Sequence, residues 1–281
     1  MPSSENDDNA DCVARVRLPA VAGRFYPDDR ETLARAVDTF ISSPAARISA
    51  LACIVPHAGY MYSGHVAGAL YSRIEPATRL LILGPNHTGA GEPLAIDATG
   101  AWRTPLRDAR IDAQLADELM AAFPLLREDE FAHRREHSIE VQLPFVQRMM
   151  SEFTFVPICV GTANLELLVN LGEAIAQVLL KSSERILMIC SSDMNHYEPD
   201  DVTRIKDGQA IAPILALDPV ALYETILRER ISMCGFAPAI ATLTACKRLG
   251  AARAELVKYA TSGDINGDRS HVVGYAGILI S

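Results

Sequence analysis

The sequence of 281 residues lacks any apolar stretch near the roughly 18 residues that suggest a membrane-spanning helix. It also lacks the basic segment and apolar core with which a secretory signal peptide begins. We therefore expect a cytoplasmic protein with no membrane partner. An excess of positive charge is missing too, because the formal net charge is -9. This acidic balance argues against nonspecific binding to nucleic acid, so no nucleic-acid partner is expected.

Cysteine pairs with metal-site or redox spacing are also lacking. The six cysteines are scattered without a CxxC pattern, and a disulfide framework is not expected in an intracellular chain. Cys53, Cys159 and Cys190 lie within apolar runs, where a free cysteine behaves as a small hydrophobic residue. Cys234 differs, because it stands beside a glycine in the loop-like stretch "SMCGFAP". It is therefore either a candidate functional thiol or a buried structural one.

Several sequence motifs of nucleotide-binding proteins and hydrolases are absent. The chain has no GxGxxG, no P-loop and no GxSxG pattern, which argues against nucleotide-dependent and serine-hydrolase chemistry. The HExxH pattern of many zinc proteases is missing as well. No single motif of these kinds therefore predicts the function.

The sequence does contain an alternation of apolar runs and amphipathic stretches. Residues 1–14 are polar and acidic and predict a disordered tail, while 15–281, without a long linker or repeat, predict a single domain. The predicted strands are 51–55, 79–83, 153–160, 185–190, 254–259 and 272–280. The predicted helices are 28–41, 110–123, 137–150, 164–180, 218–228 and 236–249. This alternation predicts an α/β fold, in which helices cover both faces of a central mixed or mostly parallel sheet.

Three of the apolar runs are followed closely by histidine or aspartate. "LACIV" precedes "PHAGY", "LLIL" precedes "GPNHTG", and "ILMIC" precedes "SSDMNHYEP". Ligands of open α/β sheets bind beyond the carboxyl ends of the strands, so parallel strands would gather His57, His87, Asp193 and His196 at one rim. Imidazoles with a carboxylate or thiolate suit Fe(II), zinc or copper. Asp193 and His196 could instead orient a ligand or transfer protons. Taken singly, each residue is also compatible with an ordinary loop, turn or capping role.

Three further stretches leave alternatives open. In "REHSIEVQLPF", residues 135–145, His137 and Glu140 could form a capping contact, a surface pair or a second polar wall of the pocket. The loop 262–277 could be a lid or a plain hairpin connection. Three side chains of "PHAGYMYSG" are candidates for the pocket floor, namely Tyr60, Tyr62 and Ser63.

Seven motifs, in this order and spacing, resemble those of the Memo-like family, whose prokaryotic members are called AmmeMemoRadiSam system protein B. The motifs are "VAGRFYP", "PHAGYMYSG", "LGPNHTG", "WRTPL", "EHSIEVQLPF", "SSDMNHY" and "CGFAP", and the resemblance runs from about Val21 to Ile280. The family is similar to the class III extradiol dioxygenases, which are non-haem Fe(II) enzymes. This resemblance implies a dioxygenase-like α/β fold with a metal site at one rim of the sheet.

The resemblance also implies roles for particular residues. The metal-binding positions of the family fall on His57, His87 and Cys234, and the pocket positions fall on Asp193, His196 and His137. Dioxygenases of this class use two histidines and a carboxylate, whereas the third position here is Cys234. A thiolate is softer and more easily oxidised than a carboxylate, which strengthens the expectation of a metal and weakens the inference of ring cleavage.

Three functional hypotheses follow. The first is a metal-dependent oxidoreductase that binds one transition metal ion, with Fe(II) or copper favoured over zinc, and acts on a small molecule. In it, His196 is the general acid or base and Asp193 orients it or completes the metal shell. The second is a non-catalytic accessory protein with AMMECR1-like and radical SAM partners, which the family name suggests. The third is a metallohydrolase.

Overall fold

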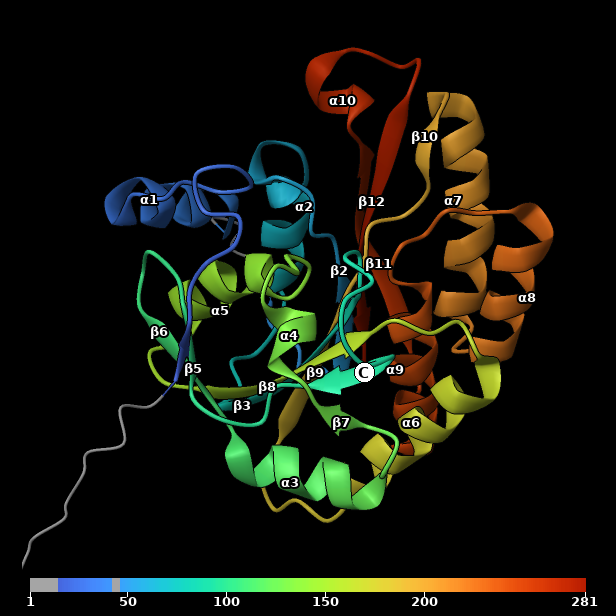
Figure 1. The fold of residues 1–281 in the computed structure, drawn as a ribbon. Helices are drawn as coiled ribbons and strands as arrows, with labels where there is room; N and C mark the ends of the chain where they lie inside the picture. The colour runs from blue at the N-terminus through green and yellow to red at the C-terminus, as the bar shows by residue number, and fades with distance from the viewer. Residues whose placement is uncertain (1–14, 42–45) are drawn as a thin grey trace, which may run out of the picture.

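The computed structural model describes residues 15–41 and 46–281 (Figure 1). The acidic tail predicted for residues 1–14 lies outside the described residues. The described residues form a twelve-stranded sheet whose main path runs β1-β5-β6-β8-β3-β9-β2-β12-β10, while β11 pairs with β12, β4 with β8 and β7 with β4. The strands are β1 (Val16–Arg17), β2 (Ala52–Val55), β3 (Arg79–Pro85), β4 (Leu94–Ile96), β5 (Ala101–Arg103), β6 (Asp108–Ile111), β7 (Arg127–Glu128), β8 (Thr154–Val160), β9 (Ile186–Ser191), β10 (His196–Glu198), β11 (Ala254–Thr261) and β12 (Val272–Ile280).

The centre of the sheet is parallel and one side of it is antiparallel. Strands β8, β3, β9 and β2 are neighbours that run in the same direction. Strand β12 pairs antiparallel with β2, and β11 pairs antiparallel with β12. The mixed, mostly parallel sheet expected from the sequence is therefore confirmed, and each of the six predicted strands overlaps one of these elements.

Helices cover both faces of the sheet, as Figure 1 shows. Helices α1, α2 and α5 pack on one face, while α3, α6, α7, α8 and α9 pack on the other. The helices are α1 (Arg30–Ile41), α2 (Tyr60–Tyr71), α3 (Ala113–Ala122), α4 (Glu130–His133), α5 (Leu143–Met149), α6 (Leu165–Leu179), α7 (Asp200–Leu215), α8 (Pro219–Glu229), α9 (Phe236–Arg248) and α10 (Gly263–Asn266). Among the described residues, no helix is both long and apolar enough to cross a membrane.

The central strands are apolar throughout because both of their faces are covered. Successive side chains of a strand point to opposite faces. In β2, Ile54 belongs to the core under α6 and α9, whereas Cys53 and Val55 belong to the core under α1, α2 and α5. All three side chains are fully buried. This explains why the strands appear in the sequence as unbroken apolar runs rather than as an alternating pattern.

Two long helices, α2 and α7, are absent from the sequence prediction. In α2 the stretch "YMYSGHVAGALY" is buried on most sides, so it lacks the one-sided apolar stripe of a surface helix. Its Gly64 and Gly68 face Phe40 of α1 so closely that a Cβ at either position would collide with that residue. The two glycines therefore serve the close packing of α1 and α2, although they weaken the helical signal of the sequence.

The structure also shows which conformation two further segments adopt, the predicted helix 137–150 and the loop 262–277. The predicted helix 137–150 begins late, with a 3-10 turn at Glu140–Gln142 followed by α5, in which Pro144 occupies the first turn. The loop 262–277 forms the tip and second strand of an antiparallel hairpin between β11 and β12, with the short helix α10 at its tip. This matches the hairpin interpretation of that segment.

Candidate metal centre

Three parallel strands deliver a polar side chain to the same rim of the sheet. His57 lies two residues beyond the end of β2, His87 two residues beyond β3, and Asp193 two residues beyond β9. Because β9 pairs in parallel with both β2 and β3, these three positions lie side by side at the carboxyl ends of the strands. The condition on which the sequence prediction depended, parallel neighbouring strands, is met.

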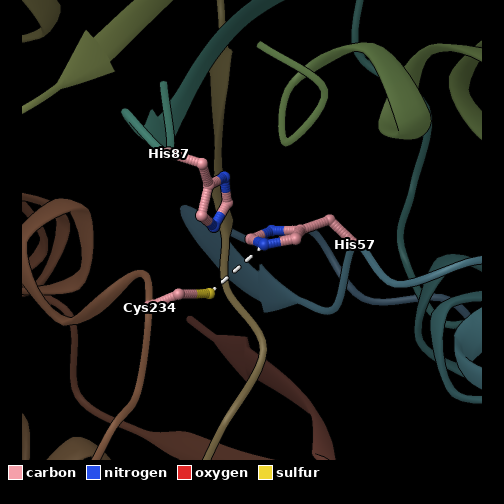
Figure 2. Close-up of side chains that lie close together, drawn as sticks. All are labelled: His57, His87 and Cys234. Carbon is pink, nitrogen blue, oxygen red and sulfur yellow. Dashed lines mark hydrogen bonds between the residues drawn. The ribbon is translucent and has the colours of Figure 1, made fainter. Parts of the chain in front are cut away.

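A thiol from the other side of the cavity completes a group of three candidate metal ligands (Figure 2). Cys234 belongs to the loop between α8 and α9, and its Sγ lies 3.2 Å from Nε2 of His57. The ligand atoms of His57, His87 and Cys234 all lie within 4.8 Å of one another. Gly235 lets this loop approach the sheet, because a Cβ there would collide with Ser192.

The ring of His57 is held in one tautomer by the residues behind it. Its Nδ1 lies 2.9 Å from Oγ of Ser191. That hydroxyl donates its own hydrogen to the carbonyl of Ser138 at 2.6 Å and accepts from Nε2 of Gln142 at 2.8 Å. Because the hydroxyl hydrogen is already used, Ser191 accepts from the Nδ1–H of His57. The lone pair of Nε2 therefore faces Cys234.

The ring of His87 is oriented by Glu136. Nδ1 of His87 lies 2.9 Å from Oε1 of Glu136, and the main-chain N–H of His87 donates to Oε2 at 2.6 Å. Figure 2 shows that the opposite edge of this ring points toward His57 and Cys234. Carboxylates that bind the second nitrogen of a metal-ligating histidine recur in metal sites, so this arrangement fits a metal ligand.

Glu136 orients residues around the candidate centre, although its carboxylate also lies near enough to His87 and His137 to be considered a ligand itself. It also accepts hydrogen bonds from the main-chain N–H groups of His137 and Ser138. Burial alone would raise the pKa of Glu136, but the hydrogen bond and charge of His87 and the N–H of Ser138 hold this pKa at about 2. Glu136 thus accepts four N–H groups and orients the ring of His87.

His137 lies against the candidate ligands but outside their group of three. Its ring stacks on that of His87 with centroids 4.7 Å apart, and it meets the ring of His57 edge-on at 5.5 Å. Both interpretations that paired it with Glu140 are wrong. Glu140 is fully buried and accepts hydrogen bonds from Arg17 and Tyr26 instead. His137 forms part of the wall of the cavity, as the third interpretation proposed.

Asp193 supports the main chain that carries His57. Its Oδ1 accepts hydrogen bonds from the N–H groups of His57 at 2.7 Å and Ala58 at 3.3 Å, and its own N–H donates to Sγ of Cys234 at 3.3 Å. Burial raises the pKa of Asp193 above its ordinary value, against the opposing effects of His196 and of the two N–H groups. Asp193 thus connects the two sides of the candidate centre through its backbone and its side chain.

His196 lies at the rim of the same cavity, with one ring nitrogen engaged. Its Nδ1 donates to the carbonyl of Ser232 at 2.9 Å, and its main-chain N–H donates to the hydroxyl of Ser232 at 2.8 Å. In a neutral ring with this hydrogen bond, Nε2 is the acceptor nitrogen. The neighbouring Tyr197 has a φ of 61° and a side chain exposed at the cavity edge, a strained backbone conformation of the kind that clusters at functional sites.

These groups line a cavity of about 600 Å³. It includes all six residues that the sequence and the family resemblance singled out, namely His57, His87, His137, Asp193, His196 and Cys234. Tyr60, Tyr62 and Ser63 do not line it, so their assignment to the pocket floor is wrong. The hydroxyl of Tyr60 donates to the carbonyl of Val141 within the core, because this residue begins helix α2 and points away from the rim.

Burial controls the protonation of two of the candidate ligands. Burial lowers the pKa of His57 well below its ordinary value, and the nearby His87 and His137 lower it further. Burial also raises the pKa of the Cys234 thiol well above its ordinary value, and the charge of Asp193 adds to this effect. A neutral imidazole is the form that binds metal ions. A coordinated cation would in turn favour the thiolate of Cys234.

Sequence reasoning missed the residues that hold the histidines in place. Glu136 and Gln142 lie within the motif "EHSIEVQLPF" and Ser191 within "SSDMNHY", yet nothing in their local pattern shows which ring each one contacts. Phe25, from "VAGRFYP", packs its ring 4.6 Å from that of His137 and also lines the cavity. The one feature of the sequence that could have assigned these residues to the site is that they lie in the same motifs as the candidate ligands.

Comparisons with known proteins agree with this geometry. The model of the family described as Memo-like protein matches residues 17–279. The chain is 42% identical to a MEMO1 family protein of Methanosarcina barkeri, with 94% of this chain and 100% of that one covered. It is 42% identical to a MEMO1 family protein of Aquifex aeolicus, with 94% and 99% covered.

A solved structure supports the fold. The chain resembles an uncharacterized protein from Escherichia coli K12 with a TM-score of 0.51 at 12% identity, covering 79% of this chain and 98% of that one. At so low an identity the likeness concerns the fold alone. The α/β fold with a mixed, mostly parallel sheet, expected from the sequence, is thereby supported. Together, the match to the family model and the sequence identity to the relatives show that this chain belongs to the Memo-like protein family.

Proposed function

We propose that this protein binds one transition metal ion through Nε2 of His57, Nε2 of His87 and Sγ of Cys234. The observation that carries the proposal is the fixed orientation of both rings. Ser191 and Glu136 occupy the Nδ1 positions, so the remaining nitrogens face the same space as the thiol. Three protein ligands leave coordination positions free for a substrate or water, as in catalytic metal sites.

The donor set favours certain metals. Two imidazoles suit iron, copper and zinc alike, while a thiolate shifts the preference toward softer ions. We propose Fe(II) or copper as the ion, with zinc as the third candidate. Such an ion would supply Lewis acidity and, for iron or copper, redox chemistry, so we propose a metal-dependent oxidoreductase with a dioxygenase-type pocket acting on a small molecule.

The protein groups around the centre supply the remaining functions of this proposal. His196 donates Nδ1–H to Ser232, and its free Nε2 takes a proton from a substrate bound in the cavity. Asp193 holds the main chain of His57 in place, and His137 forms the wall against which a substrate packs. The cavity of about 600 Å³ lies in the range of small-molecule sites.

Elemental analysis of protein purified anaerobically tests the proposal. We expect about one metal ion per chain, because the two candidate ligand groups share His87, and loss of most of it in His57→Ala and Cys234→Ala. His271→Ala is the matched control, because His271 is an exposed residue of the β11–β12 hairpin. The control should retain the wild-type metal content. Full metal occupancy in His57→Ala would contradict the proposed centre.

A further inference from the structure

A second cavity of about 890 Å³ adjoins the candidate metal centre. Its walls come from the segment 15–25 and from the segment 130–137, together with Asp97. Phe25 and His137 line this cavity and the metal cavity alike. The two cavities therefore adjoin at Phe25 and His137, whose rings pack with centroids 4.6 Å apart, and a ligand that occupies both cavities must pass over this pair of rings.

The second cavity is rich in arginine. Five arginines line it, and three of them are held by carboxylates, namely Arg15, Arg17 and Arg134. The side chains of the other two, Arg24 and Arg135, make no hydrogen bond or ion pair with any of the described residues. Both residues are exposed. In a chain with a net charge of -9, two unpaired guanidinium groups in one cavity form a local site for an anion.

The segment that carries Arg24 is firmly built into the protein. Glu140, buried beneath it, accepts hydrogen bonds from the main-chain N–H of Val21 at 3.0 Å and from the hydroxyl of Tyr26 at 2.6 Å. Gly23, with a φ of +76°, makes a tight turn in which its N–H donates to the carbonyl of Tyr26 at 2.7 Å. This turn presents Arg24 toward the cavity and holds the neighbouring Phe25 at the junction with the metal cavity.

We propose that Arg24 and Arg135 bind the anionic group, a carboxylate or a phosphate, of a small-molecule substrate whose other end lies at the metal centre. This inference rests on the proposed function and specifies its substrate class. A guanidinium presents a planar set of N–H donors that matches carboxylate and phosphate oxygens. The rings of Phe25 and His137, which pack against each other, form one surface for the part of the substrate that joins its anionic group to its reacting end.

Isothermal titration of metal-loaded protein with three simple probes tests the inference. Benzoate carries the carboxylate, phenyl phosphate carries the phosphate, and benzamide is the uncharged analogue of benzoate. We expect at least one anionic probe to bind more tightly than benzamide. Arg24→Gln and Arg135→Gln should each weaken that binding about tenfold, as the loss of one charge-assisted contact does, and the double variant should abolish the preference for the anion.

Arg253→Gln is the matched control. Arg253 is exposed and pairs with Glu255 next to β11, whose residue Ala254 pairs with Ile280. Ile280 in turn pairs with Ala52 at the start of β2, so this arginine lies at the end of the sheet opposite to the metal centre. Its variant should bind the probes as the wild type does.

The same titrations after treatment with a chelator separate this inference from the proposed metal centre. An anion held by Arg24 and Arg135 keeps its dependence on both arginines in metal-free protein, whereas an anion that binds the ion directly does not. Probe binding that is unchanged in Arg24→Gln and Arg135→Gln overturns the anion subsite, whatever the metal content. Retention of metal by His57→Ala overturns the metal centre. The dependence of anion binding on Arg24 and Arg135 is then a separate result, which the loss of the metal centre does not affect.

Discussion

Glu136 holds His87 by two hydrogen bonds at once, one from Nδ1 of the ring at 2.9 Å and one from the main-chain N–H at 2.6 Å. The ring and the backbone of His87 are thereby fixed together, although about a third of its side chain (32%) is accessible to solvent. Burial lowers the pKa of His87, but the hydrogen bond and negative charge of Glu136 outweigh this effect and raise it above the ordinary value. This carboxylate therefore determines where the more exposed candidate ligand points.

Replacement of this carboxylate should weaken metal binding. In Glu136→Gln the amide retains one acceptor oxygen but loses the charge and the second acceptor. We expect metal affinity to fall about 10- to 100-fold, as is usual when an outer partner of a ligating histidine is changed. Competition with a chelator measures this affinity. Glu128→Gln, at an exposed position of β7, is the control and should bind metal as the wild type does. Equal affinities in the two variants would show that Glu136 does not orient a ligand.

Loss of Asp193 should destabilise the fold as well as the site. Its Oδ1 accepts two N–H groups, from His57 and Ala58, and Asp193 itself is buried. Asp193→Ala leaves these donors without their acceptor, which costs about 1–3 kcal/mol in the free energy of unfolding. Asp193→Asn keeps an acceptor oxygen and should lose less than Asp193→Ala. Urea unfolding of metal-free protein, followed by circular dichroism, measures both values, and equal losses would contradict this role of Oδ1.

Glu140 should be more important for stability than an exposed acidic residue that also pairs with arginine. It is fully buried and pairs with Arg17, whose side chain is only 8% exposed. Glu140→Ala leaves the guanidinium buried without its partner, so we expect a loss of about 3–5 kcal/mol in the free energy of unfolding. Glu173→Ala is the control, because Glu173 and Arg248 are both well exposed and such pairs contribute about 0–1 kcal/mol. Similar losses in both variants would contradict the structural role assigned to Glu140.

Asp207 should make stability depend on pH. Burial raises its pKa to about 7, although the hydroxyl of Tyr259 and the N–H of Asn195 oppose the shift. Between its ordinary value of 3.8 and about 7, this carboxyl is ionised in the unfolded chain but protonated in the folded one. The unfolded state then binds fewer protons, so the free energy of unfolding falls as pH rises through this window.

The variant Asp207→Asn removes this titration. Its unfolding free energy should fall less between pH 4 and pH 7 than that of the wild type, by up to about 4 kcal/mol, which corresponds to roughly three pKa units. Urea unfolding at several pH values, with a chelator present to exclude metal effects, measures the difference. Asp201→Asn, at an exposed position of the same helix, should follow the wild-type curve. A wild-type pH dependence in Asp207→Asn would refute the assignment.

Much of the fold and part of the site could be predicted from the sequence. Strands that are covered on both faces must be apolar along their whole length, so β2, β3 and β9 are visible as short apolar runs. The polar residues that follow each run then mark the rim, because ligands collect at the carboxyl ends of parallel strands. His57 and His87 could be placed at one rim in this way, whereas Cys234 was assigned to the metal positions through its likeness to the family.

The contacts that orient these side chains were decided by the tertiary structure alone. Glu136 reaches His87, Ser191 reaches His57, and Glu140 reaches Arg17 across distances in sequence that no local pattern encodes. Helix α2 was missed for a related reason, since its burial between α1 and the sheet removes the one-sided pattern by which a surface helix is recognised. The sequence by itself determined which strands end in candidate metal-binding side chains. Only packing between distant segments decided which nitrogen each ring presents, because a hydrogen bond depends on positions in space rather than on separation along the chain.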